Sequence, residues 1–252
     1  MRTRISYLVA MLMALLLASA CQGEDAAPVS ASPDDPAPAA PTQAPTPAEV
    51  PSILSVPQGE APTIDGTLSP GEWDGAATDL FADGSELFLI YSDGYLYLGI
   101  RSTTPEMIAG NIFVDRGDEI AILHASAALG TALYAQAGES WEQIQGFAWR
   151  CRSTGNGKAA QAERDAFFRE EHWVAANSRT GTPAELEYQI AAADGTLRLA
   201  ANILRSSSPD SKTPWPADLD DDCIKPTPGG LPEALRFSPH RWATVGLPSL
   251  ER

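Results

Sequence analysis

The sequence predicts a mainly β protein, an antiparallel β-sandwich of the immunoglobulin-like, jelly-roll type with one short helix. Short segments with apolar residues at alternating positions recur along the chain, and turns such as Ser92-Asp93-Gly94 separate them. One segment, from Ala159 to about Trp173, has a helical pattern with Phe167 and Phe168 as its apolar anchors. Many short strands joined by turns are typical of a sandwich.

The strands follow from the alternating pattern. They are predicted at residues 86–91, 95–101, 111–115, 119–124, 131–136, 141–151, 185–192, 196–204 and 241–247. Leu96, Leu98 and Ile100 share one face of their strand, which we expect to be buried. Tight turns close two hairpins early in the chain, and Asp194-Gly195 is predicted as a further hairpin turn.

The chain begins with the layout of a secretory signal, predicted to span residues 1–20. Arg2 and Arg4 provide positive charge, residues 5–17 form a nearly unbroken apolar run, and the small residues 18–20 precede Cys21. The apolar run is shorter than the roughly 20 residues that a membrane-spanning helix needs. A cysteine directly after small residues resembles the lipobox of bacterial lipoproteins, although alanine stands where that motif commonly has leucine.

The lipobox resemblance implies a diacylglyceryl anchor on the sulfur of Cys21, with palmitate as the expected fatty acid. It places the mature protein outside the cytoplasm, held at the bacterial cell membrane by its lipid. The alternative is an ordinary A-x-A cleavage site, which would give a soluble secreted protein with a free thiol.

Residues 21–51 are predicted to be a disordered tether. Ala, Pro, Ser and Thr dominate this segment, which cannot bury enough surface to offset the entropy of ordering. A proline-rich ligand for a partner protein is the alternative. Residues 52–248 are long enough for one sandwich domain with a core of its own.

The negative net charge and the lack of catalytic motifs limit the classes of function that we expect. The formal net charge of −16 at pH 7 repels phosphate groups, so we expect no nucleic-acid partner and membrane attachment through lipid alone. The sequence contains no G-x-S-x-G, H-E-x-x-H or P-loop motif. We therefore expect a non-catalytic protein without a metal or cofactor.

The other two cysteines, Cys151 and Cys223, are expected to form a disulfide in an exported domain. A metal site is the alternative, but the chain has no C-x-x-C and no histidine pair at ligand spacing. Phe147, Trp149 and Cys151 fall on one face of a predicted strand, so Trp149 is predicted to pack on the disulfide. The other predicted core tryptophans are Trp73, Trp173 and Trp242.

Residues 61–76 read Ala-Pro-Thr-Ile-Asp-Gly-Thr-Leu-Ser-Pro-Gly-Glu-Trp-Asp-Gly-Ala. This segment resembles the opening of family-9 carbohydrate-binding modules and of the wider DOMON-like sandwiches. The resemblance implies a sandwich that recognises carbohydrate at the cell surface. The alternatives are a structural or protein-interaction lipoprotein of the cell envelope, and a haem-binding sandwich. Haem ligands would come from Met107, His124, His172 and His240.

Two tryptophans are candidate platforms for a sugar ring. Trp215 lies between two prolines and before an acidic run whose carboxylates could accept hydrogen bonds from hydroxyl groups. The candidate ligand-binding residues are Trp215, Trp141, Asp218, Asp220 and Asp222. The alternative for Trp215 is a buried loop anchor. Calcium binding by the acidic run is a further alternative, although EF-hand spacing is missing and solvated charge is the simpler interpretation.

Overall fold

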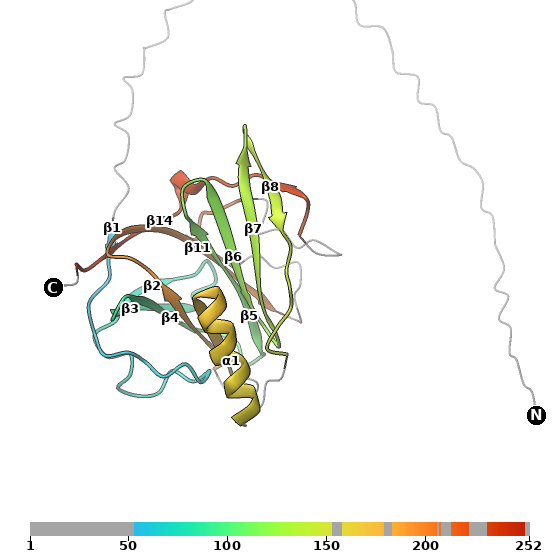
Figure 1. Cartoon of the computed structure of the whole chain (residues 1–252). Coiled ribbons are helices and arrows are strands. Elements are labelled where there is room, and N and C mark those ends of the chain that lie inside the picture. The colour runs from blue at the N-terminus through green and yellow to red at the C-terminus, as the bar shows by residue number, and fades with distance from the viewer. Residues whose placement is uncertain are drawn as a thin grey trace, which may run out of the picture. The chain divides into compact units, whose positions relative to one another are not determined.

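The computed structural model describes residues 53–152, 158–178, 183–205, 207, 213–221 and 231–249. These residues form two β-sheets that pack face to face, and one α-helix, α1 (Lys158–Glu171), lies beside them (Figure 1). Apart from the parallel pair β1–β14, the neighbouring strands within each sheet are antiparallel. The predicted fold class, a mainly β antiparallel sandwich with one short helix, is confirmed.

The two sheets differ in size. The larger has the order β1 (Ile53–Ser55), β14 (Ala243–Leu247), β11 (Gly195–Arg205), β5 (Ile108–Asp115), β6 (Glu119–Ala125), β7 (Leu129–Ala137), β8 (Ser140–Gln145) and β13 (Ala234–Leu235), and β12 (Pro214–Trp215) also pairs with β11. The smaller has the order β2 (Ala77–Leu80), β3 (Glu86–Ser92), β4 (Tyr95–Arg101), β10 (Glu185–Ala191) and β9 (Trp173–Asn177). A short 3₁₀ helix, η2 (Pro239–Arg241), precedes β14.

Turn chemistry explains the first hairpin. Between β3 and β4, Asp93 has a φ of 49° and Gly94 a φ of 85°. Two successive positive φ values are the requirement of a type I′ turn, which matches the twist of the flanking strands. The β5–β6 hairpin is also present, so both early hairpins that the sequence predicts are confirmed.

The main core lies between the inner faces of the sheets. Leu96 and Leu98 of β4 are fully buried in one cluster with Ile112 of β5. Tyr188 of β10 joins the two layers, because its hydroxyl donates a hydrogen bond to the carbonyl of Gly110 in β5 at 2.8 Å. A Cβ atom at Gly110 would lie 2.8 Å from that hydroxyl, so only glycine permits the approach.

The segment at residues 61–76 lies on the smaller sheet. The backbone N–H groups of Asp65, Gly66 and Leu68 donate to the carboxylates of Glu187 and Glu185 at 2.7–3.0 Å. Trp73 is 8% exposed and packs with Leu68, Ile90 and Tyr97, so its predicted core role is confirmed. The motif that resembles carbohydrate-binding modules is therefore a docked loop.

The C-terminal part of the domain covers the outer face of the larger sheet. Leu219, Phe237 and Trp242 pack with Phe113 and Ile122 in a second buried cluster. Trp242 is 3% exposed, and Trp173, in the main core, is 1% exposed. Both tryptophans are core residues, as the sequence predicts.

The main differences from the sequence prediction concern one turn and the ends of two elements. Asp194-Gly195 does not close a hairpin, because β10 pairs within the smaller sheet and β11 within the larger one. Strand β8 ends at Gln145, and the chain that follows leaves the sheet. The helix ends at Glu171, and Trp173 begins β9 instead, because His172 between them takes a positive φ of 60°.

Several predictions lie outside the described residues: the signal at 1–20, the anchor Cys21, the tether at 21–51, Asp222 and Cys223. All described residues belong to one compact unit, Ala48–Arg252. Within the described part of the chain, no helix has the length and apolar character needed to cross a membrane.

Candidate functional site

The structure buries both candidate sugar platforms, Trp215 and Trp141, and for Trp215 this agrees with the alternative of a buried loop anchor. Trp215 is 1% exposed, and its indole Nε1 donates to Asp79 Oδ2 at 2.9 Å. Trp141 is 6% exposed and packs edge-on against Phe237. Both rings are enclosed by neighbours, so neither presents a face for stacking in this conformation.

The acidic run divides between surface and interior. Asp218 is exposed and pairs with Arg241 at 3.5 Å, and Asp220 is also exposed. Asp221, a further carboxylate of the acidic run that the sequence offers to ligand hydroxyls, is 4% exposed. Its Oδ2 accepts hydrogen bonds from the Ser238 N–H at 3.1 Å and the Trp242 indole at 2.7 Å. This carboxylate therefore fixes the C-terminal covering of the sheet rather than facing a ligand.

The described residues contain no candidate metal-binding cluster. No group of three or more His, Cys, Asp or Glu side chains placed to hold a metal ion occurs among them. Cys151 has a buried thiol whose pKa is raised, chiefly because burial disfavours the thiolate. Its predicted partner Cys223 lies outside the described residues, so the disulfide stays a prediction.

The tryptophan that does reach the surface is Trp149, which the sequence places on the disulfide. It is 39% exposed. Phe147 covers one side of its ring at a centroid distance of 4.7 Å and an interplanar angle of 30°, and His124 meets it edge-to-face at 5.0 Å. The strand predicted over residues 141–151 is too long, because β8 ends at Gln145 and Cys151 takes a positive φ of 51°. Packing of Trp149 on the disulfide stays a prediction, since Cys223 lies outside the described residues.

Glycine makes room for this aromatic cluster. A Cβ atom at Gly130 of β7 would lie 3.0 Å from Trp149 Cε3 and 3.1 Å from Phe147 Cδ1. These separations are shorter than ordinary contacts, so any larger residue would displace one of the rings. Gly130 lies opposite His124 in the β6–β7 register, which brings all three rings over one place on the sheet.

His124 is a neutral member of the aromatic cluster, and its ring is held in place by a hydrogen bond. Its Nδ1 lies 2.7 Å from Asn111 Oδ1, which assigns the ring proton to Nδ1. Burial lowers the pKa of His124 to about 4, so the ring is uncharged near neutral pH. The amide and the two neighbouring rings account for this histidine without a haem.

A hollow of about 320 Å³ adjoins Trp149, and we call it the Trp149 slot. It is lined by Ser126, Ala127, Ala128, Trp149 and Arg152. Residues 126–128 form the turn between β6 and β7, and Arg152 is exposed. The slot thus combines an aromatic wall, a hydroxyl group and one cation.

The segment that carries Trp149 is held at its far end. Arg150 and Leu129 exchange two backbone hydrogen bonds, each of 2.9 Å. The Arg150 guanidinium also pairs with Glu170 of α1 at 2.7 Å, and the Cys151 N–H donates to Glu163 Oε1 at 2.8 Å. Trp149 is therefore presented by a fixed segment, although its side chain is partly exposed.

Comparisons with known proteins concern the fold. No protein-family model and no curated protein matches the chain. Among solved structures it is similar to a family-9 carbohydrate-binding module from Caldicellulosiruptor kristjanssonii in complex with cellotriose, at 12% identity and a TM-score of 0.41 over 79% of this chain and 95% of that one. The same module in complex with glucose matches at 10% identity and a TM-score of 0.41, over 79% and 97% of the two chains. A protein from Bacteroides uniformis matches at 12% identity and a TM-score of 0.39, over 77% and 96%. Similarity this distant carries no argument about a ligand or a site.

Proposed function

We propose that the domain is a non-catalytic carbohydrate-binding domain and that the Trp149 slot binds a sugar ring. The observation that supports this is the partly exposed Trp149, held over Gly130 by Phe147 and His124. A pyranose ring has an apolar C–H face, and a large aromatic surface is its natural complement. A fixed indole also loses little conformational entropy when it binds.

The polar part of the slot suits the hydroxyl edge of the same ring. The Arg152 guanidinium offers several donors in one plane, and the Ser126 hydroxyl can donate or accept. The neutral His124 adds no charge beside the aromatic wall. A purely apolar ligand would make no use of the Arg152 guanidinium, whereas a sugar hydroxyl can accept a hydrogen bond from it.

Glycan-array binding of the full-length protein tests this proposal, followed by titration with cello-, xylo-, manno- and chito-oligosaccharides. We expect Trp149→Ala to weaken binding at the slot by about tenfold or more, because truncating a central aromatic contact typically costs over 1 kcal/mol. Ile144→Ala is the matched control, since Ile144 is another exposed apolar side chain at 59% exposure and does not line the slot.

Two results would contradict the proposal. One is equal binding by the Trp149→Ala and Ile144→Ala variants. The other is a blank array together with specific capture of one envelope protein, which would favour the alternative of a protein-interaction lipoprotein.

We further propose that lipid on Cys21 anchors this domain outside the cytoplasm. The support is the sequence layout alone: Arg2, Arg4, an apolar run and small residues before the cysteine. A clickable fatty acid should label the wild type and leave Cys21→Ala unlabelled. Equal labelling of both proteins, or none of either, would refute the anchor.

A further inference from the structure

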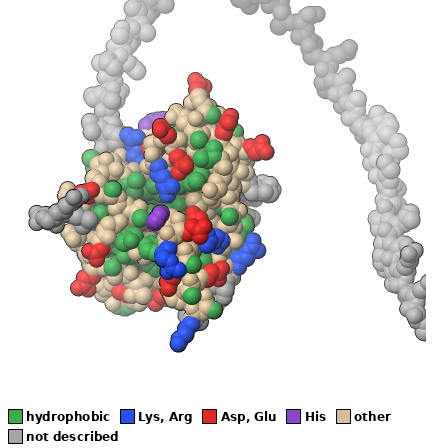
Figure 2. All heavy atoms as spheres, in the orientation of Figure 1, with side chains coloured by type: hydrophobic (Ala, Val, Ile, Leu, Met, Phe, Trp, Pro, Cys, Tyr) green, Lys and Arg blue, Asp and Glu red, His purple; other side chains and the backbone are tan. Residues whose placement is uncertain are grey.

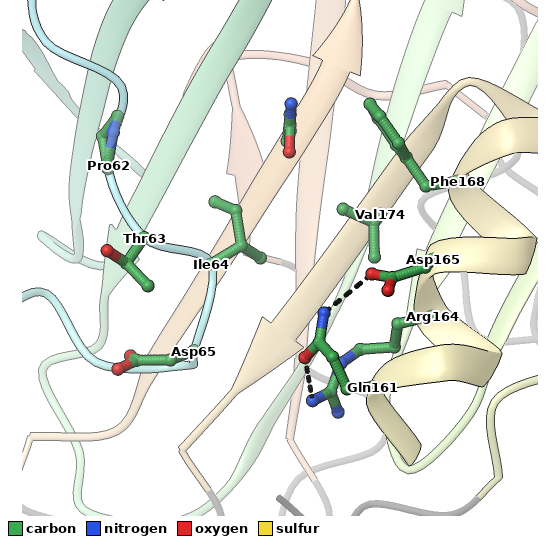
Figure 3. A pocket seen from close by; sticks show the side chains of 10 residues that line it. Pro62, Thr63, Ile64, Asp65, Gln161, Arg164, Asp165, Phe168 and Val174 are labelled. Carbon is green, nitrogen blue, oxygen red and sulfur yellow. Dashed lines mark hydrogen bonds between the residues drawn. The ribbon is translucent and has the colours of Figure 1, made fainter. Parts of the chain in front are cut away.

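A second hollow lies between α1 and the loop at residues 62–65 (Figure 3). Gln161, Arg164, Asp165 and Phe168 line one side, because their spacing of three and four residues places them on one face of the helix. The hollow has a volume of about 380 Å³, which lies within the usual range for small-molecule pockets. We call it the helix pocket.

The floor of the helix pocket belongs to the smaller sheet. Gln189 of β10 and Val174 of β9 are cross-strand partners, and both line the pocket. Tyr188 and Ile190 are buried in the main core, so Gln189 between them points to the outer face. Figure 2 shows the side of the molecule on which α1 lies, where acidic and basic side chains surround an area of apolar atoms.

The polar side chains of the helix are already arranged by hydrogen bonds. Gln161 Nε2 donates to Asp165 Oδ1 at 2.8 Å, and Arg164 Nη2 donates to Gln161 Oε1 at 3.0 Å (Figure 3). Arg164 Nε is buried and has no hydrogen-bond partner among the described residues, so the guanidinium keeps unused donor capacity. Carboxylate, amide and guanidinium groups each place two hydrogen-bonding atoms in one plane, a geometry that matches two neighbouring hydroxyl groups.

Apolar side chains complete the lining. Ile64 lies on the loop side, and Phe168 and Val174 lie on the opposite side near α1 and β9 (Figure 3). A wholly apolar ligand would leave the buried Nε of Arg164 without an acceptor. A polyanion would meet Asp65 and Asp165, so the lining suits a neutral ligand with both hydroxyl and C–H surfaces.

We infer that the helix pocket is a second, independent carbohydrate site that takes one sugar residue. Its chemistry rests on its own lining and does not require the Trp149 slot to bind. The two sites lie on the outer faces of different sheets, so one molecule would hold two sugar residues at once. Two sites on one domain give avidity for a branched or multivalent glycan.

The test titrates the full-length protein with the same oligosaccharides, with the side-chain amide signals of Gln161 and Gln189 followed by NMR. We expect both signals to shift and the wild type to bind two ligands. The double variant Gln161→Ala with Asp165→Ala should weaken this site at least about tenfold, the loss of one or two hydrogen bonds. Both changes keep helix propensity, and each single variant serves if the pair does not fold.

Arg169→Ala is the matched control on the same helix, because Arg169 is exposed and does not line the pocket. Loss of pocket binding in the helix variant with slot binding intact supports the inference, and so does pocket binding that survives Trp149→Ala. Two results would overturn the inference. One is that no oligosaccharide shifts the amide signals, and the other is a single binding event that Trp149→Ala alone abolishes. If the Trp149 slot binds no sugar, the amide signals still report binding at the helix pocket, and if the helix pocket binds none, the Trp149→Ala variant still tests the slot.

Discussion

Replacement of Glu187 by glutamine should change how the stability of this domain depends on pH. Glu187 lies on β10, is fully buried, and accepts the N–H groups of Asp65 at 3.0 Å and Gly66 at 2.7 Å. Burial is the main reason that the pKa of this carboxyl rises from 4.5 to about 7, and the nearby charge of Asp65 adds to it. The group that docks the 61–76 loop thus titrates near neutral pH.

The sign follows from where the proton is bound. Between pH 4.5 and about 7 the folded protein keeps the Glu187 proton and the unfolded chain has lost it, so stability falls as pH rises through this window. One pKa unit corresponds to about 1.4 kcal/mol, so the full loss is on the order of 3 kcal/mol. Glutamine stays neutral and its oxygen can still accept both N–H groups, so this loss should disappear.

His124 acts in the opposite direction. Burial lowers its pKa from 6.5 to about 4, so its contribution to stability is fully present above pH 6.5 and is lost as pH falls toward 4. Between pH 4.5 and 6.5 the two slopes have opposite signs and similar size. In the wild type, the combined contribution of Glu187 and His124 to the free energy of unfolding should therefore change little across this pH range. In Glu187→Gln, only the contribution of His124 remains, so the free energy of unfolding should rise with pH.

Urea unfolding at pH 4.5, 5.5, 6.5 and 8, followed by tryptophan fluorescence, measures the effect. Relative to the wild type, Glu187→Gln should gain roughly 3 kcal/mol between pH 4.5 and 8. Glu60→Gln is the control, since Glu60 is exposed and docks nothing. Parallel curves for the wild type and Glu187→Gln would refute the reasoning.

Two further predictions use matched pairs. Gly130→Ala should weaken sugar binding at the slot several-fold with little change in melting temperature, because its Cβ would lie 3.0 Å from the Trp149 ring. Gly146→Ala is the control: its Cβ would meet only the flexible side chain of Gln143 at 3.4 Å, so this variant should bind normally in the same titration. Asp221→Ala should cost about 1–3 kcal/mol in urea unfolding, because the buried Trp242 indole and the partly buried Ser238 N–H lose their acceptor. Asp218→Ala should cost under about 1 kcal/mol, because its ion pair is on the surface. A larger loss for Asp218→Ala would contradict the second pair.

The fold could be predicted from the two-residue alternation of apolar side chains, because the central strands are long enough to show this pattern. In β4, Leu96, Leu98 and Ile100 alternate with outward-facing residues, and all three are buried as predicted. Strands of two to five residues, such as β12 and β9, have too few positions for a pattern. Their pairing depends on distant partners that local sequence does not specify.

The burial of Trp215 and the exposure of Trp149 could not be predicted from the sequence for the same reason. Trp215 is flanked by prolines, as many surface loops are, yet a carboxylate 136 residues away satisfies its indole in the interior. Trp149 follows a strand pattern, yet the strand has already ended. The contact of Phe147 and Trp149 with Gly130 joins residues 17 and 19 positions apart, so it also depends on the fold and not on local sequence.

Helix α1 connects the two proposed sites while keeping them separate. Its Glu163, Phe167 and Glu170, spaced by four and three residues, contact the segment that carries Trp149. Glu163 accepts the Cys151 N–H and Glu170 pairs with Arg150. The Arg150 guanidinium lies 5.5 Å from the centroid of the Phe167 ring. The residues that line the helix pocket occupy a different face of the same helix. A change confined to one face should therefore alter one site and leave the other in place, which is why single-face variants can assign each binding event.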